Sequence, residues 1–162
     1  LLIKAKSRGL SDKFGKQLKA MLHKGPSNFS QSVPKASIDE LLTLYNQKKY
    51  SSVINQAYDL TKKYLKDVVL WNLYGSAAAQ LGELDDAIIA FERVISLKPD
   101  FAEAYSNLGL ALQNRSQLNE ALINYKIAVS LKPDMPMLII TWAMHFTIQV
   151  TWRVLLMHTE KQ

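Results

Sequence analysis

Apolar residues recur at helical spacing through the middle of the chain. From residue 70 to residue 81 they fall three or four positions apart, which predicts an amphipathic helix. Gly82 interrupts the pattern, and a second apolar stripe then runs to Pro99, which cannot continue a helix. The pattern therefore predicts two helices joined by a tight turn, with Asp85 as the N-cap of the second.

The same plan occurs again directly after this first unit. Residues 67–100 align on 101–134 without a gap, and ten of the aligned pairs are identical, including the run Ser-Leu-Lys-Pro-Asp that ends both units. The second unit has Asn119 at the cap position and Pro133 at the stop. One hairpin cannot bury its apolar stripe alone, so a tandem array predicts a shared core. We expect an all-α fold, an α-solenoid of antiparallel helix hairpins.

Small residues indicate where the two helices of a unit come close. We expect Gly75 to face Ala87 within the first of these hairpins, and Gly109 to face its counterpart in the second. Phe91 should then fill the space toward the neighbouring unit. A larger side chain at these positions would overpack the helix crossing.

The two units resemble tetratricopeptide (TPR) repeats. The likeness covers residues 67–134, and the phrases YSNLGLAL and EALINYKIAVSLKPD more specifically resemble bacterial TPR proteins whose repeats are similar to those of O-linked N-acetylglucosamine transferases. The resemblance implies a TPR superhelix and favours a bacterial source. The residues that match the signature are Trp71, Tyr74, Gly75, Ala78, Ala87, Phe91 and Pro99, then Tyr105, Leu108, Gly109, Leu112, Ala121, Tyr125, Ala128 and Pro133.

The segments before the two clear repeats are less regular. Residues 38–66 have two apolar stripes one period upstream, with Leu41 at the glycine position and Val53 at the alanine position, and they are predicted to form a divergent TPR. Residues 25–37 are rich in Ser and Pro and are interpreted as a linker. Residues 1–24 are predicted to be a basic N-terminal helical segment, either a solvated helix or a helix for an anionic surface.

Residues 135–162 depart from the repeat and form an atypical apolar segment, for which several interpretations stay open. It is expected to be a helix that caps the last unit, over Tyr125 and Ala128. A vestigial hairpin, a departure from the parental reading frame and a membrane span over residues 137–157 are the alternatives. Arg153 argues against the span, because burying its charge in lipid is costly.

Composition narrows the classes of protein. The chain is 48% hydrophobic and 21% charged, which is typical of globular proteins. It has no cysteine, which excludes disulfides and thiolate metal sites. The net charge of +6 comes from residues 1–24, so the repeats carry no basic surface for nucleic acid. We expect a cytoplasmic protein with no nucleic-acid partner and no membrane span; because residue 1 is Leu, we also expect a fragment of a longer protein.

No group of residues indicates catalysis or a cofactor. The three histidines have no metal-like spacing, and Gly75 and Gly109 lie within predicted helices rather than in a phosphate-binding loop. Asp85 and Asp86 are adjacent on a helix and diverge, so we interpret them as a solvated helix start. The sequence therefore predicts no enzyme activity, no metal site and no cofactor.

A groove lined by the first helix of each hairpin remains as the candidate site, and the TPR resemblance implies it. Amide and hydroxyl side chains there can bond the backbone of an extended peptide with little regard to its sequence. Of the asparagine ladder of the sugar-transferase repeats, only Asn107 is matched, because Leu73 stands one unit earlier. The predicted binding residues are Asn72, Ser76, Gln80, Ser106, Asn107, Leu110, Gln113 and Asn114.

We therefore expect a non-catalytic protein–protein interaction scaffold that binds a peptide or partner protein in this groove. Because the groove positions of both clear repeats lack cations, we predict no binding to the acidic chaperone tails that other TPR domains grip. The alternatives are the N-terminal substrate-recognition region of a larger glycosyltransferase or sulfotransferase, without its catalytic domain, and a membrane-attached TPR protein. The sequence does not indicate an oligomeric state.

Overall fold

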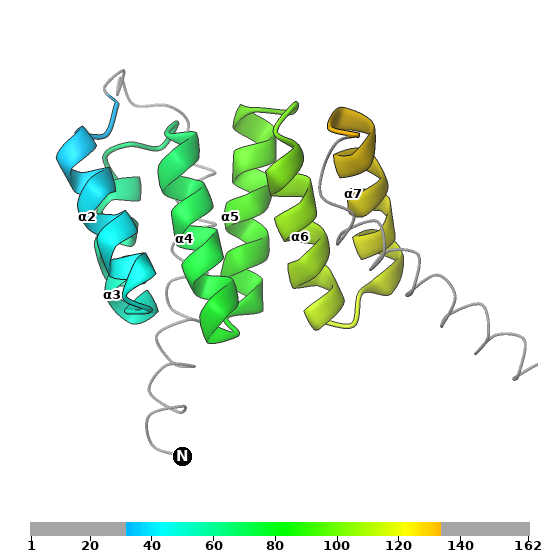
Figure 1. Ribbon diagram of the computed structural model, residues 1–162, viewed down its shortest axis with the longest axis horizontal. Helices are drawn as coiled ribbons and strands as arrows, with labels where there is room; N and C mark the ends of the chain where they lie inside the picture. The colour runs from blue at the N-terminus through cyan, green and yellow to red at the C-terminus, as the bar shows by residue number, and fades with distance from the viewer. Residues whose placement is uncertain (1–31, 134–162) are drawn as a thin grey trace, which may run out of the picture.

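The computed structural model describes residues 32–133, which contain six helices and no strand. The helices pair into three antiparallel hairpins that stand side by side in one row (Figure 1). The predicted all-α solenoid is thereby confirmed. The helices are α2 (Lys35–Asn46), α3 (Tyr50–Thr61), α4 (Val68–Leu81), α5 (Leu84–Leu97), α6 (Ala102–Asn114) and α7 (Leu118–Leu131).

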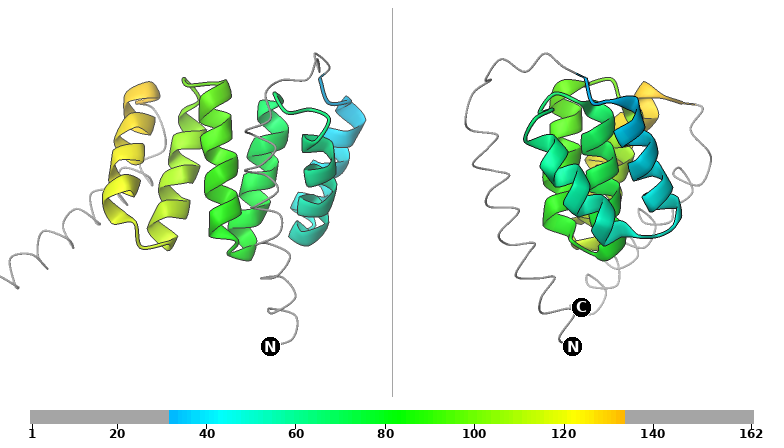
Figure 2. Two further views of the ribbon diagram at one scale, coloured as in Figure 1. Left: turned by 180° about the vertical axis from the view of Figure 1, so that it is seen from behind. Right: turned by 90° about the vertical axis from the view of Figure 1, so that its left-hand side faces the viewer.

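The repeat period reappears in the helix boundaries. The second helices of the three hairpins begin at Tyr50, Leu84 and Leu118, which are equally spaced along the chain. The first helices α4 and α6 begin at Val68 and Ala102, with the same spacing. The views from behind and from one side show the hairpins stacked in chain order (Figure 2). The divergent segment before residue 67 thus has the same hairpin plan as the two clear repeats.

The turn inside each hairpin has the same backbone conformation. Gly82, which follows α4, has a φ of +76°, and the amide of Glu83 donates to the Ala78 carbonyl at 2.9 Å. Lys48 and Ser116, one period before and after Gly82, have φ values of +58° and +66°. Left-handed backbone costs a residue with a side chain about 1–2 kcal/mol, so glycine is the favoured residue at this position. Only the middle hairpin has glycine there.

The predicted N-caps are wrong by two residues. The N-cap positions of α5 and α7 are Glu83 and Gln117, and neither side chain accepts a capping hydrogen bond. Asp85 and Asn119 lie within the first turn, because the tight turn leaves a single residue between Gly82 and the helix. A true side-chain cap occurs at Asp67, which accepts from the Leu70 amide at 2.9 Å.

The expected glycine contact is also different. A Cβ atom at Gly75 would lie 2.9 Å from Cε1 of Phe91 and 3.0 Å from Cβ of Ala90, so the nearest neighbours do not include Ala87. The ring of Phe91 therefore occupies the space left by glycine within its own hairpin. In the α2/α3 hairpin, Leu41 and Ala57 stand at the two equivalent positions, and both are buried. The large and small residues have exchanged places there.

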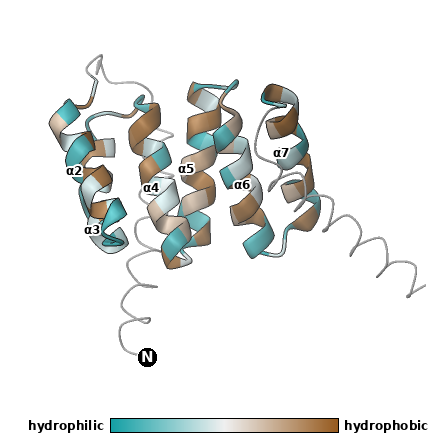
Figure 3. Ribbon diagram, in the orientation of Figure 1, coloured by the Kyte–Doolittle hydropathy of each residue, from teal (hydrophilic) through white to brown (hydrophobic). Residues whose placement is uncertain are grey.

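The core continues from one hairpin to the next. Trp71, Tyr74 and Phe91 are almost fully buried. The Trp71 indole N–H and the Arg93 guanidinium both donate to the Leu65 carbonyl, at 3.0 and 3.3 Å, and so fasten the loop between the first two hairpins. Burial lowers the pKa of Arg93. Figure 3 shows apolar and polar stretches on every helix of the row, as expected of helices with one buried side.

Three sequence predictions concern residues outside the described range. They are the basic segment at 1–24, most of the linker at 25–37 and the apolar segment at 135–162. Linker residues 32–37 are described: residues 32–34 precede α2, and the helix already begins at Lys35. Within residues 32–133, no helix has the length and apolar character needed to cross a bilayer.

Candidate functional site: the first-helix face

The first helices of the hairpins form one continuous face. Helix α4 contacts both α2 and α6, whereas α3 and α5 each contact the first helix of the following hairpin. We call the outward side of α2, α4 and α6 the first-helix face. The predicted binding residues belong to α4 and α6, and thus to two neighbouring helices of this face.

Two of the predicted residues meet across the hairpin boundary. The side-chain amide of Asn107 donates to Oδ1 of Asn72 at 3.4 Å, a long hydrogen bond between half-buried groups. Asn72 lies one position away from the residue equivalent to Asn107, and that residue, Leu73, is buried in the core. The amides of α4 and α6 are therefore brought together, although they do not occupy equivalent positions in the repeat.

Gln113 has a structural role that the sequence does not reveal. Its Oε1 atom accepts a hydrogen bond from the Tyr125 hydroxyl at 3.0 Å. A tyrosine hydroxyl is protonated at neutral pH, and burial raises the pKa of Tyr125 further, to about 12. Gln113 thus joins the first-helix face to the second helix of its own hairpin, and this bond uses one lone pair of its amide oxygen.

The other predicted residues differ in exposure. Ser76 and Ser106 are half-buried, Gln80 and Asn114 are exposed at the ends of their helices, and Leu110 is 46% exposed. Leu110 stands at the position equivalent to Ser76, so this position has a polar side chain in the second hairpin and an apolar one in the third. Val69, at the start of α4, adds an aliphatic side chain that is 52% exposed. The face offers amides, hydroxyls and a few exposed aliphatic groups.

Charge is nearly absent from α4 and α6, two of the three helices of the face. Neither α4 nor α6 contains a lysine or an arginine. The acid on α6, Glu103, accepts from Lys132 at 2.7 Å, and this hydrogen bond lowers the pKa of Glu103. Helices α4 and α6 therefore offer no cation to an acidic ligand.

Acidic residues outside the face form interactions within and between the hairpins. Asp85 is exposed as predicted and pairs with Arg115 at 2.8 Å, but Asp86 is buried, contrary to the prediction of a solvated pair. The Tyr74 hydroxyl donates to Oδ2 of Asp86 at 3.5 Å. Burial, and then the charge of Asp86, raise the pKa of Glu83. Among residues 32–133, no group of three or more acidic or histidine side chains could hold a metal ion.

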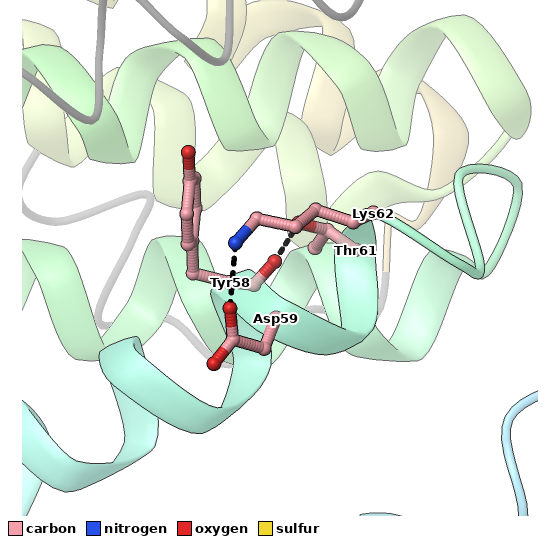
Figure 4. A network of polar contacts seen from close by, with 4 residues as sticks. All are labelled: Tyr58, Asp59, Thr61 and Lys62. Atoms are coloured by element: carbon pink, nitrogen blue, oxygen red, sulfur yellow. Dashed lines mark hydrogen bonds and ion pairs between the residues drawn. The ribbon is translucent and has the colours of Figure 1, made fainter.

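A polar network lies at the C-terminal end of α3, the second helix of the first hairpin. Lys62 lies 2.6 Å from Oδ1 of Asp59 and 4.3 Å from the centre of the Tyr58 ring, and the Thr61 hydroxyl donates to the Tyr58 carbonyl (Figure 4). The hydrogen bond to Asp59 raises the pKa of Lys62. Lys62 therefore interacts with Asp59 and with the ring of Tyr58 at the end of α3.

A row of stacked helix hairpins with a constant period is the architecture of helical repeat proteins. Residues 75–116 match the family model described as TPR repeat, and residues 102–135 match the model described as tetratricopeptide repeat. The two models together match residues 75–135, which lie almost entirely within the part of the chain that resembles tetratricopeptide repeats in its sequence. No curated protein sequence matches the chain.

Solved structures, among them TPR domains, share this fold at low sequence identity. The first TPR domain of human RPAP3 is similar with a TM-score of 0.66 and 19% identity, over 71% of this chain and 90% of that domain. The first TPR of Spaghetti (RPAP3), bound to the HSP90 peptide SRMEEVD, has a TM-score of 0.68 and 19% identity, over 72% and 91%. SycD of Yersinia enterocolitica, in complex with a peptide of the translocator YopD, has a TM-score of 0.68 and 15% identity, over 78% and 98%.

Proposed function

We propose that this chain is a non-catalytic interaction scaffold that binds an extended peptide or a segment of a partner protein on its first-helix face. The observation that carries the proposal is the continuity of this face: Asn107 of α6 reaches Asn72 of α4, so one ligand can contact two hairpins. Spaghetti and SycD, which share the fold, hold peptides.

The chemistry of the face defines the ligand. Half-buried amides and hydroxyls can bond a peptide backbone, while Leu110 and Val69 contact apolar side chains. Because α4 and α6 carry no basic residue, we expect a ligand whose contacting stretch is uncharged. A bacterial source and kinship with the sugar-transferase repeats stay part of the proposal, on the sequence phrases quoted above. The matched family models and the structures named above give no support to a transferase fragment.

A matched pair of serine substitutions tests the proposal. Peptides displayed on phage are selected against the full chain, and the enriched sequences are synthesised and titrated. Ser76→Arg places a bulky cation on α4, within the face, whereas Ser96→Arg places the same group at an exposed position of α5, a second helix that is not part of the face. We expect Ser76→Arg to weaken binding at least about tenfold, equal to about 1.4 kcal/mol, and Ser96→Arg to leave it within about twofold.

The asparagine pair provides a second measurement. Asn72→Ala with Asn107→Ala removes the contact between α4 and α6 without adding bulk, and should also weaken binding. Failure to enrich any peptide, or equal affinity of the wild type and the Ser76→Arg variant, would contradict the proposal. Circular dichroism of each variant shows whether the helices are retained.

A further inference from the structure

Two exposed leucines of the first-helix face stand at the same position of the repeat. Leu42 of α2 is 40% exposed and Leu110 of α6 is 46% exposed. Ser76 of α4 lies midway between them in the sequence, so the three side chains form one row across α2, α4 and α6. Single exposed leucines are common on protein surfaces, but a pair at equivalent repeat positions gives this row an apolar group at each end.

The α2 part of the face is more apolar than the α4 part. Ile38, one turn before Leu42, is half-buried and packs against the core, as does Tyr45, one turn after it. The ring of Tyr45 meets the ring of Tyr50 edge to face, with 5.2 Å between their centres, and this contact holds it in place. At the position of Ile38, α4 has Asn72. Leu42 therefore belongs to an apolar patch, although the sequence predicts no binding residue on α2.

The surface between the two leucines is polar and uncharged. Ser76 is half-buried there, and one turn earlier on α4 Oδ1 of Asn72 accepts from the Asn107 amide at 3.4 Å. Neither α4 nor α6 contains a lysine or an arginine. Hydroxyl and amide groups can bond the N–H and C=O groups of a peptide backbone, but they offer no opposite charge to an ionised side chain.

The separation of the leucines sets the spacing of the side chains that can reach both. Helices α2 and α6 lie on either side of α4, and both contact it (Figure 1). Axes of packed helices are about 8–10 Å apart, so the two ends of the row are about 16–20 Å apart. An extended chain rises about 3.3 Å per residue and turns every second side chain to the same side, so the even spacing that fits is about six residues.

We propose that the ligand of the first-helix face is an extended, uncharged segment of another protein with two large aliphatic side chains about six residues apart, one on Leu42 and the other on Leu110. This inference rests on the proposed function, because it names the ligand of the same face. The residues between the two side chains bond Ser76 and the asparagine pair through their backbone, so their sequence can vary. The two aliphatic side chains then supply the specificity that backbone contacts lack.

Peptide selection on the full chain tests the spacing. Random peptides of about 16 residues are displayed on phage, and the enriched sequences are aligned on Leu, Ile, Val and Met. We expect pairs at positions i and i+6 to exceed pairs at i and i+5 several-fold, because an odd spacing points the two side chains to opposite sides. Pairs at i and i+11 would indicate a helical ligand, which rises about 1.5 Å per residue, and would overturn the proposal.

The same selection separates this inference from the proposed function. Enriched peptides that compete with one another but share no aliphatic pair would overturn the inference and leave peptide binding intact. Failure to enrich any peptide would contradict both. If the wild type also sedimented as a dimer and Leu42→Ser/Leu110→Ser as a monomer, a second copy of the chain would be the occupant of the face instead.

A cycle of variants tests the two contacts. Leu42→Ala and Leu110→Ala are titrated with a selected peptide and with versions of it in which one aliphatic residue is alanine. We expect each variant to weaken binding of the selected peptide at least about fivefold, and less than about twofold once the peptide residue opposite it is alanine. Equal losses with all three peptides would show that the leucines do not contact these side chains, and would overturn the proposal.

Leu81→Ala is the matched control. Leu81 is at the end of α4 and is 42% exposed, but it follows Ala78 by one turn and Tyr74 by two, and both of these are buried. It therefore lies on the core side of the helix rather than in the row. We expect Leu81→Ala to leave binding within about twofold, with the helices of all three variants retained by circular dichroism. An equal loss with Leu81→Ala would show that the row has no special part in binding.

Discussion

The ring of Tyr125 lies against Gly109 so closely that a Cβ atom at position 109 would be 2.7 Å from Cε1 of the ring. Phe91 and Gly75 form the same contact one hairpin earlier, with a corresponding distance of 2.9 Å. In the first hairpin the two positions hold Leu41 and Ala57 instead, and both are buried. The two positions therefore share one volume, which either residue can fill.

This shared volume predicts a rescue by size exchange. Gly109→Leu should destabilise the array by about 1–3 kcal/mol or more through overpacking, and Tyr125→Ala by about 3–5 kcal/mol through the loss of a buried ring. Combining them recreates the residues of the first hairpin, so the double variant should be more stable than the sum of the two losses implies. Urea unfolding of the four proteins gives the coupling energy, which we expect to be about 1–3 kcal/mol. Strict additivity would contradict the shared volume.

The left-handed turn positions predict two stabilising substitutions. Lys48→Gly and Ser116→Gly put glycine where the backbone already has φ values of +58° and +66°. Each should raise the free energy of unfolding by about 0.5–1 kcal/mol, since relief of strain exceeds the added freedom of the unfolded chain. Gly82→Ala, at the equivalent turn with no atom within 4 Å of the added Cβ, should lower it by a similar amount. A decrease in the thermal midpoint of Ser116→Gly would refute the prediction.

Glu83 predicts a pH-dependent effect. Its pKa is raised above 4.5 in the folded chain, so the folded state holds the proton more tightly than the unfolded state does. Ionised Glu83 therefore opposes folding at neutral pH, and the penalty is lost as the pH falls through the folded pKa toward 4.5. Glu83→Gln should have a higher thermal midpoint than the wild type at pH 7 and a similar one near pH 4.

Asp85 is the control for this prediction, because it lies on the same turn but is exposed and pairs with Arg115. Asp85→Asn should leave the midpoint at pH 7 unchanged or slightly lower, since exposed ion pairs contribute little. If both substitutions shifted the midpoint in the same direction by the same amount, a general effect of net charge would explain the result.

The absence of lysine and arginine from α4 and α6 predicts that the HSP90 peptide SRMEEVD, which is bound by Spaghetti, does not bind here. Helices α4 and α6 offer no lysine or arginine to its acidic residues. Fluorescence polarisation with the labelled peptide should show no saturation up to a protein concentration of about 1 mM. A dissociation constant of that size corresponds to a binding free energy of about −4 kcal/mol. Saturable binding that Ser76→Arg does not alter would place the peptide elsewhere on the chain.

The helix plan can be predicted from the sequence because its signals are local and repeated. Gly82 and Pro99 mark helix ends by their own backbone chemistry, and the constant period of the repeat carries those ends into the next unit. The N-cap prediction fails because the preference for Asp85 is weak compared with the geometry of a one-residue turn.

The contacts between side chains cannot be predicted in the same way. Gly75 meets Phe91 rather than Ala87 because the direction of an aromatic ring depends on three-dimensional packing, which helical phase does not specify. Asp86 is buried although it neighbours the exposed Asp85, since Tyr74 donates to it across the hairpin. The sequence assigns Gln113 to the face alone, because its bond to Tyr125 depends on a residue in the other helix of the hairpin.

The binding of a peptide to the first-helix face is tested most directly by NMR titration of the full chain, labelled with ¹⁵N, with a peptide enriched by selection. We predict shift changes for the backbone and side-chain amides of Asn72 and Asn107 and for the backbone amide of Ser76, with little change along α5 and α7. Changes concentrated on α3, α5 or α7, with these three residues unaffected, would contradict the proposed binding site.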